Sequence, residues 1–129
     1  MMSSFNLQKQ IDYWKNGALS DIETAEILVE KDKLLHGLFF CHLTIEKAIK
    51  AHYVKATNNL APKTHDFTYL LTKANLEIEE SYQPLLGILM KYQLEGRYPE
   101  NKIDSPSKER TKDYLNQTKK LLEWLVKKL

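Results

Sequence analysis

Residues 38–53 read Leu-Phe-Phe-Cys-His-Leu-Thr-Ile-Glu-Lys-Ala-Ile-Lys-Ala-His-Tyr. Apolar side chains cover almost the whole circumference of a helix built from this stretch, and helices of that kind are buried. Glu46, Lys47 and Lys50 nevertheless lie within it, together with two histidines. Because a buried charge must be paired, the stretch predicts both the centre of the fold and the first candidate for a polar site.

The apolar pattern on either side of this stretch predicts further helices. Steps of three and four residues predict an amphipathic helix over residues 7–30. The central helix follows it at once, with Asp32 as the expected N-cap, and ends near Thr57. A short third helix over residues 67–74, a fourth from about residue 82 to near Gly96, and a fifth that runs to the C-terminus complete the pattern. We therefore expect one domain of residues 1–129 with an all-α fold, a four-helix up-and-down bundle with an additional short helix.

The bulk composition is that of an ordinary globular protein and excludes several classes. The chain of 129 residues has 43% hydrophobic and 28% charged residues, and its net charge of +2 excludes a strongly basic nucleic-acid binder but not a local basic patch. Cys41 has no second cysteine with which to form an intramolecular disulfide. The N-terminus lacks the pattern of a secretory signal, and no stretch reaches the about 18 apolar residues of a membrane span. These features predict a cytoplasmic protein that does not enter a membrane.

One face of the central helix has more apolar residues than a single core needs. At 100° per residue, Phe40, Leu43 and Val54 point away from the main apolar face. Either the helix is sandwiched between other elements, or this second face packs against another subunit. We favour a homodimer through this helix, because symmetric dimers are the commonest oligomers.

The charged residues of the central helix have two interpretations. Glu46 and Lys50 are one helical turn apart, in the orientation that favours an ion pair. Such a pair is structural on a solvated face, but it becomes a candidate functional group at the border of an apolar face. His42 and His52 lie on or near the core face and are interpreted as buried imidazoles with hydrogen-bond partners.

Two further positions carry residues that structure alone explains only in part. In Thr64-His65-Asp66, an N-cap role explains Asp66, whereas histidine is not a preferred cap. Arg97, followed by Tyr98 and a proline, suits the C-terminal end of a helix dipole and is also a typical fork for a carboxylate or a phosphate. No cysteine, histidine or carboxylate set has the spacing of a metal site, and no phosphate loop is present, so no metal or cofactor is expected.

Three motifs occur in a fixed order along most of the chain, and they carry a resemblance to a known family. They are Phe40-x-His42-x-x-Ile45-Glu46-Lys47-Ala48-x-Lys50-Ala51, Pro62-x-Thr64-His65-Asp66-Phe67 followed by Leu70-Leu71, and Arg97-Tyr98-Pro99. In these motifs the chain resembles the HEPN family, the higher eukaryote and prokaryote nucleotide-binding domain. The resemblance implies a helical bundle, commonly dimeric, often encoded in prokaryotes beside a minimal nucleotidyltransferase and linked to nucleotide or RNA handling.

The resemblance also implies which residues form the ligand-binding site. Glu46, Lys47 and Lys50 match the family's polar signature on the central helix. His65 and Asp66 match its loop motif, and Arg97 with Tyr98 matches its arginine motif. Ribonucleases of the wider superfamily carry a histidine a few positions after the arginine. Here Lys102, Ile103 and Asp104 occupy those positions, so the usual RNA-cleaving motif is incomplete and catalytic residues are not assigned.

Three functions are therefore compared. The first is a dimeric nucleotide- or RNA-binding module, in which Lys50 and Arg97 contact phosphate and Glu46 orients Arg97, with a nucleotidyltransferase as its candidate partner in a toxin–antitoxin-like system. The second is a metal-independent endoribonuclease toxin. The third is a non-catalytic dimeric scaffold, in which the polar residues only secure the helix packing. The sequence favours the binding module.

Overall fold

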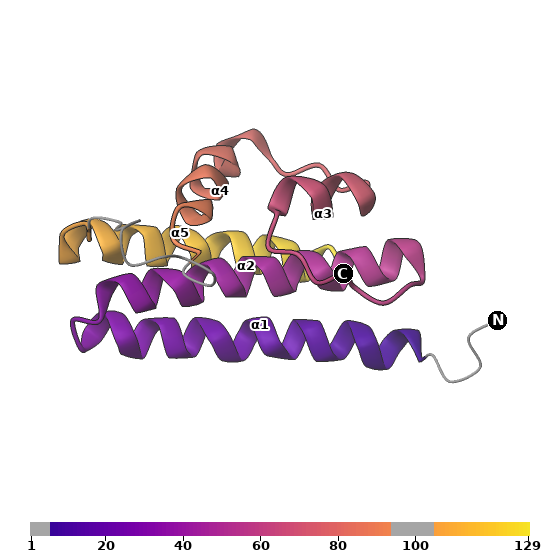
Figure 1. The fold of residues 1–129 in the computed structure, drawn as a ribbon, viewed down its shortest axis with the longest axis horizontal. Helices are drawn as coiled ribbons and strands as arrows, with labels where there is room; N and C mark the ends of the chain where they lie inside the picture. The colour runs from indigo at the N-terminus through magenta and orange to yellow at the C-terminus, as the bar shows by residue number, and fades with distance from the viewer. Residues whose placement is uncertain (1–5, 94–104) are drawn as a thin grey trace.

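The computed structural model describes residues 6–93 and 105–129, and the described residues form helices and no strands (Figure 1). Three helices are long: α1 Leu7–Glu30, α2 Leu34–Thr57 and α5 Lys108–Lys127. The shorter elements are α3 Phe67–Lys73, the 3-10 helix η1 Glu80–Tyr82 and α4 Gln83–Met90. The expected all-α fold, a helical bundle with a short extra helix, is confirmed.

The central position of α2 follows from its composition. The helices α1, α2 and α5 lie side by side along the long axis, and α3 and α4 cover the side of α2 opposite α1 (Figure 1). In the first turn of α2, a Cβ on Gly37 would lie 2.6 Å from Val29 Cγ2, so glycine lets α2 pass α1 this closely. The helix with the most apolar circumference is thus the one that is surrounded by the others.

The N-terminus of α2 differs from the prediction. Asp32 is not its cap, since Asp32 has a positive φ of 64° and its carboxylate pairs with Lys108 Nζ of α5 at 2.7 Å. Lys33 takes the N-cap position without a side-chain hydrogen bond. Asp32 therefore ties the α1–α2 turn to the start of α5, and Lys108 lowers its pKa through a hydrogen bond and through charge.

The fourth helix is shorter than predicted. It ends at Met90, where the backbone N–H groups of Lys91 and Tyr92 turn back to the carbonyls of Ile88 and Leu89. This turn buries Tyr92, and burial of an aromatic side chain offsets the loss of a regular helical turn. The predicted end near Gly96 lies outside the described residues. Within residues 6–93 and 105–129, the bundle therefore has three long helices and two short ones, instead of four long helices and one short one.

The sequence pattern predicted that Val54 faces outward, but in the structure it does not. It is completely buried inside the same chain, in a small apolar cluster with Ile11 and Ala51 against which Trp14 and Leu129 pack. The prediction that Val54 contacts a second subunit was therefore wrong. At this end of α2 the other interpretation holds, in which the helix is sandwiched between elements of its own chain. Phe40 packs against the main core, and Phe40 and Leu43 are both partly exposed. The homodimer stays a prediction that would use these two residues without Val54.

Candidate functional site

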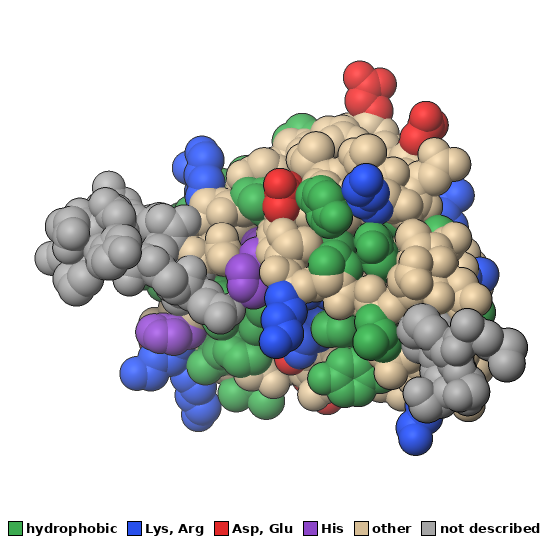
Figure 2. All heavy atoms as spheres, turned by 45° about the vertical axis from the view of Figure 1, so that its right-hand side comes forward, with side chains coloured by type: hydrophobic (Ala, Val, Ile, Leu, Met, Phe, Trp, Pro, Cys, Tyr) green, Lys and Arg blue, Asp and Glu red, His purple; other side chains and the backbone are tan. Residues whose placement is uncertain are grey.

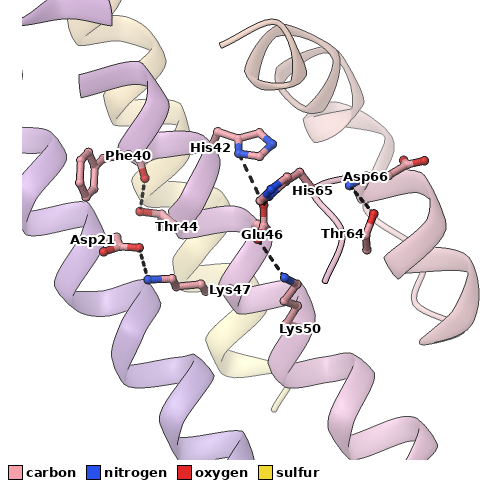
Figure 3. A network of polar contacts seen from close by, with 10 residues as sticks. All are labelled: Asp21, Phe40, His42, Thr44, Glu46, Lys47, Lys50, Thr64, His65 and Asp66. Carbon is pink, nitrogen blue, oxygen red and sulfur yellow. Dashed lines mark hydrogen bonds and ion pairs between the residues drawn. The ribbon is translucent and has the colours of Figure 1, made fainter. Parts of the chain in front are cut away.

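Four polar side chains meet where the segment before α3 crosses α2, and Glu46 lies at their centre (Figure 3). His65 Nδ1 donates to Glu46 Oε1 at 2.8 Å, and Lys50 Nζ donates to Glu46 Oε2 at 3.0 Å. His42 Nδ1 lies 3.8 Å from Glu46 Oε1. We call Glu46, Lys50, His65 and His42 the Glu46 cluster. It joins a helix to a segment that follows 19 positions later in the sequence.

The members of the cluster differ in how far they reach the surface. The side chains of Glu46 and Lys50 are only 5% and 6% exposed, whereas that of His65 is 33% exposed. Lys50 Nζ also lies 5.1 Å from the centre of the Trp14 ring, a cation–π contact that further compensates its buried charge. Histidine, basic and hydrophobic side chains gather on the face of the molecule drawn in Figure 2. His65 is therefore the cluster member that an external molecule can reach.

His42 is the innermost member of the cluster. Its ring is fully buried and stacks on Phe67 of α3, with 4.7 Å between the ring centres and 19° between the planes. Burial lowers the pKa of His42, while the Glu46 carboxylate and the His65 backbone raise it by a smaller amount. Neither ring nitrogen makes a hydrogen bond of ordinary geometry to the described residues. The expected burial of His42 is therefore confirmed, whereas the expected hydrogen bonds of ordinary geometry are not found among the described residues.

His52, by contrast, is the partnered core histidine that the sequence predicted. Its Nε2 forms a hydrogen bond with the backbone carbonyl of Leu125 in α5, at 2.8 Å. Burial lowers its pKa as well, and the neighbouring Lys55 and Lys128 act in the same direction. His52 thus secures the packing of α5 on α2.

Lys47 lies away from the Glu46 cluster, on the side of α2 that faces α1. Its Nζ pairs with Asp21 Oδ2 of α1 at 2.8 Å (Figure 3). A Cβ on Gly17 would lie 3.1 Å from Lys47 Cδ, so the glycine leaves room for the stem of this lysine. Asp21 was not singled out from the sequence, although its place among Ala18, Ile22 and Ala25 on the apolar face of α1 was a usable signal.

Asp66 has the capping role that the sequence assigned to it. Its Oδ1 accepts from the backbone N–H groups of Thr68 and Tyr69, and Thr64 Oγ1 accepts from the Asp66 N–H. These bonds fix the start of α3 and, with it, the segment that holds His65. Asp66 thus supports the site through the backbone.

The sequence model of the HEPN domain matches residues 11–129. This chain belongs to the HEPN family. Its fold is similar to that in the crystal structure of TT1696 from Thermus thermophilus, with a TM-score of 0.77 and 18% identity over 93% of this chain and 98% of that one. At this identity the likeness supports the fold alone. No curated protein matches the sequence.

The described residues of the HEPN signature are therefore divided among three places in this structure. Glu46, Lys50 and His65 come together, Lys47 pairs with α1, and Asp66 caps α3. Arg97 and Tyr98 lie outside the described residues. Both oxygens of Glu46 already have partners, so Glu46 does not need Arg97 to be paired.

Two kinds of feature are absent from the described part of the chain. No group of three or more histidine, cysteine, aspartate or glutamate side chains in residues 6–93 and 105–129 could hold a metal ion. None of the described helices is long and apolar enough to cross a bilayer.

Proposed function

We propose that this HEPN protein binds the phosphate groups of a nucleotide or RNA segment at the surface that His65 reaches. The observation that carries the proposal is the 2.8 Å contact of a buried carboxylate with a histidine whose side chain is 33% exposed. A carboxylate partner fixes both the tautomer and the orientation of an imidazole. Because Nδ1 donates to Glu46, a phosphate contact uses Nε2, which donates to a phosphate oxygen only when it carries a proton too. In the proposed complex His65 is therefore an imidazolium, and its ring is already oriented at little further cost in side-chain entropy.

Lys50 has a different role in this proposal from the one expected from the sequence. Its ammonium group is buried, bound to Glu46 and covered by Trp14, so it compensates the Glu46 charge instead of contacting phosphate. Arg97 keeps the phosphate contact expected for the binding module, and Tyr98 or Tyr53 offers a stacking surface for a base. The phosphate contact within the described residues therefore moves from Lys50 to His65.

The test is the binding of a fluorescently labelled short single-stranded RNA and of AMP, measured by anisotropy and calorimetry. His65→Asn retains a donor near the position of Nδ1 and removes the rest of the ring, so the bond to Glu46 is kept and the ligand contact is lost. We expect at least tenfold weaker binding by His65→Asn and by Arg97→Ala, with melting temperatures near that of the wild type. Lys31→Ala, which removes one exposed positive charge next to α1, is the control and should bind normally.

Equal binding by wild type and His65→Asn would contradict the proposal. If, in addition, the polar variants changed only the melting temperature, the cluster would be a structural device and the protein a scaffold. The saturation of both Glu46 oxygens supports that alternative.

The endoribonuclease is the other candidate, and the same histidine supports it. A partly exposed imidazole oriented by a carboxylate is the kind of group that general acid–base chemistry uses. Incubation of RNA without divalent cations would then give 2′,3′-cyclic phosphate ends, and His65→Asn would abolish them. RNA that stays intact under these conditions excludes this candidate.

The remaining expectations rest on the family resemblance. We propose a homodimer, a minimal nucleotidyltransferase as partner in a toxin–antitoxin-like pair, and a cytoplasmic location. Light scattering after gel filtration tests the first, and co-purification of the two proteins encoded side by side tests the second.

A further inference from the structure

A groove of about 720 Å³ lies between α3 and α4, and none of the Glu46 cluster residues lines it. Apolar side chains line it from both helices and from the segment that connects them: Phe67, Leu71, Leu76, Ile78, Leu86 and Met90. Phe67, Ile78 and Leu86 are buried, while Leu71, Leu76 and Met90 are partly exposed. The groove is therefore an apolar surface that the described residues leave uncovered.

The lining residues of α4 form one helical stripe. They are Gln83, Leu86, Gly87 and Met90, spaced at three, one and three residues, and α3 contributes a similar stripe from Phe67 to Thr72. Each wall thus runs for about two helical turns, roughly 10 Å. The two helices are inclined to each other (Figure 1), and apolar stripes of this length on both walls offer contacts to a short amphipathic helix.

Charge is distributed unevenly around the groove. Among the described residues that line it, Glu77 is the only ionisable one, and the exposed Glu79 and Glu80 follow directly. None of these lining residues is a lysine or an arginine, but Lys73 and Lys91 directly follow the lining residues Thr72 and Met90, so the acidic rim is confined to the connection between the two helices. Figure 2 shows acidic side chains at the top of the molecule, the end where the connection between α3 and α4 lies in Figure 1. The occupant that complements this surface has an apolar stripe flanked by positive charge.

We propose that the groove between α3 and α4 docks a basic amphipathic helix of a partner protein. The apolar stripe of that helix packs on Leu71, Leu76 and Met90, and its lysine or arginine side chains meet the acidic rim of Glu77, Glu79 and Glu80. The proposal is independent of whether the His65 surface binds phosphate.

Gly87 gives the test its sharpest variant. A Cβ at this exposed position meets nothing within 4 Å, so a large side chain enters the groove without displacing the core. Gly87→Trp and Gly87→Leu fill the groove, and Gly87→Ala is the matched control that leaves it open. Circular dichroism and a thermal melt of each variant check that the fold is kept.

The probe is a fluorescein-labelled synthetic helix with leucine at positions i, i+3, i+4 and i+7 and lysine at the flanking positions. A second peptide has glutamate in place of every lysine. Anisotropy should show that the lysine peptide binds the wild type and Gly87→Ala alike and binds Gly87→Trp and Gly87→Leu at least tenfold more weakly. The triple variant Glu77→Gln, Glu79→Gln, Glu80→Gln should bind several-fold more weakly and with less dependence on salt.

Three results would overturn the proposal. They are no binding of the lysine peptide to the wild type, undiminished binding to the folded Gly87→Trp and Gly87→Leu proteins, and equal binding of the glutamate peptide. The last result would show that the surface binds apolar molecules without regard to charge.

Discussion

Glu46 and Lys47 are neighbours in the sequence, both belong to the HEPN signature, and they lie in different environments on α2. Glu46 is buried and holds Lys50 and His65 against the α3 side, with side chains 5% and 6% exposed for the Glu46–Lys50 pair. Lys47 pairs with Asp21 on the α1 side, where the two side chains are 28% and 12% exposed. Desolvation makes an unpaired charge costly on the first side, while water compensates much of the loss on the second. Residues of one motif can thus differ widely in what they contribute to stability and to a site.

The largest effect is expected from Glu46→Ala. The substitution leaves the Lys50 ammonium buried without its carboxylate, and loss of one partner of a buried pair costs about 3–5 kcal/mol. Urea denaturation followed by circular dichroism measures the change. The double variant Glu46→Leu with Lys50→Met, which removes both charges, should recover a large part of the lost stability; no recovery would show that the cost arises from packing instead of charge.

The pH dependence of stability compares His42, on the α3 side, with His52, which contacts α5. Burial lowers the folded-state pKa of both below the ordinary value of 6.5. As the pH falls below about 6.5, these histidines bind protons more readily in the unfolded chain than in the folded protein. The free energy of unfolding therefore falls by up to ~1.4 kcal/mol per pH unit for each histidine. Above about pH 7 this contribution vanishes.

Denaturation between about pH 7.5 and pH 5, which spans the ordinary histidine titration range, measures that slope. His42→Leu keeps an apolar contact with Phe67, and His52→Gln keeps a donor for the Leu125 carbonyl. Each should flatten the slope, and the two together should flatten it further. A slope unchanged in both variants would mean that other groups cause the acid sensitivity.

Asp66→Ala tests the support of the His65 segment. Loss of an N-cap costs about 1 kcal/mol, and hydrogen exchange of the Thr68 and Tyr69 amides should accelerate. Asp66→Asn, which retains the accepting oxygen, is the control. Slow exchange in the alanine variant would show that the Glu46–His65 bond alone fixes this segment.

The smallest effect is expected from Asp21→Asn on the α1 side of α2. Because Lys47 reaches water, the free energy of unfolding should fall by about 1 kcal/mol or less. A loss as large as that of Glu46→Ala would remove the distinction between the two sides. Thermal denaturation of both variants in one buffer gives the comparison.

The sequence predicted what depends on local pattern. The bounds of α1 and the end of α2 follow from apolar periodicity, and the role of Asp66 follows from cap chemistry. The pairing of Glu46 with Lys50 follows from their spacing of one turn. The family resemblance placed His65 in the site, and the structure brings it to Glu46.

What the sequence did not predict depends on contacts between distant segments. Asp32 was expected to cap α2, but its ion pair with Lys108 of α5 uses the same carboxylate. Periodicity placed Val54 outside the main apolar face of α2. The side chains that bury it come mostly from α1, from the segment after α2 and from the C-terminal residue. Periodicity within one helix contains no information on which neighbour covers its second face.

The measurement that tests the central claim most directly is a long-range ¹H–¹⁵N NMR spectrum of the histidine rings, recorded with and without a short single-stranded RNA. Without RNA, we expect His65 to carry a proton on Nδ1, donating to Glu46. With RNA bound, we expect a proton on both ring nitrogens, because Nε2 must donate to the phosphate, and the His65 ring signals should shift while those of His52 do not. A proton on Nε2 alone, or His65 signals that stay unchanged at saturating RNA, would contradict the proposed phosphate contact.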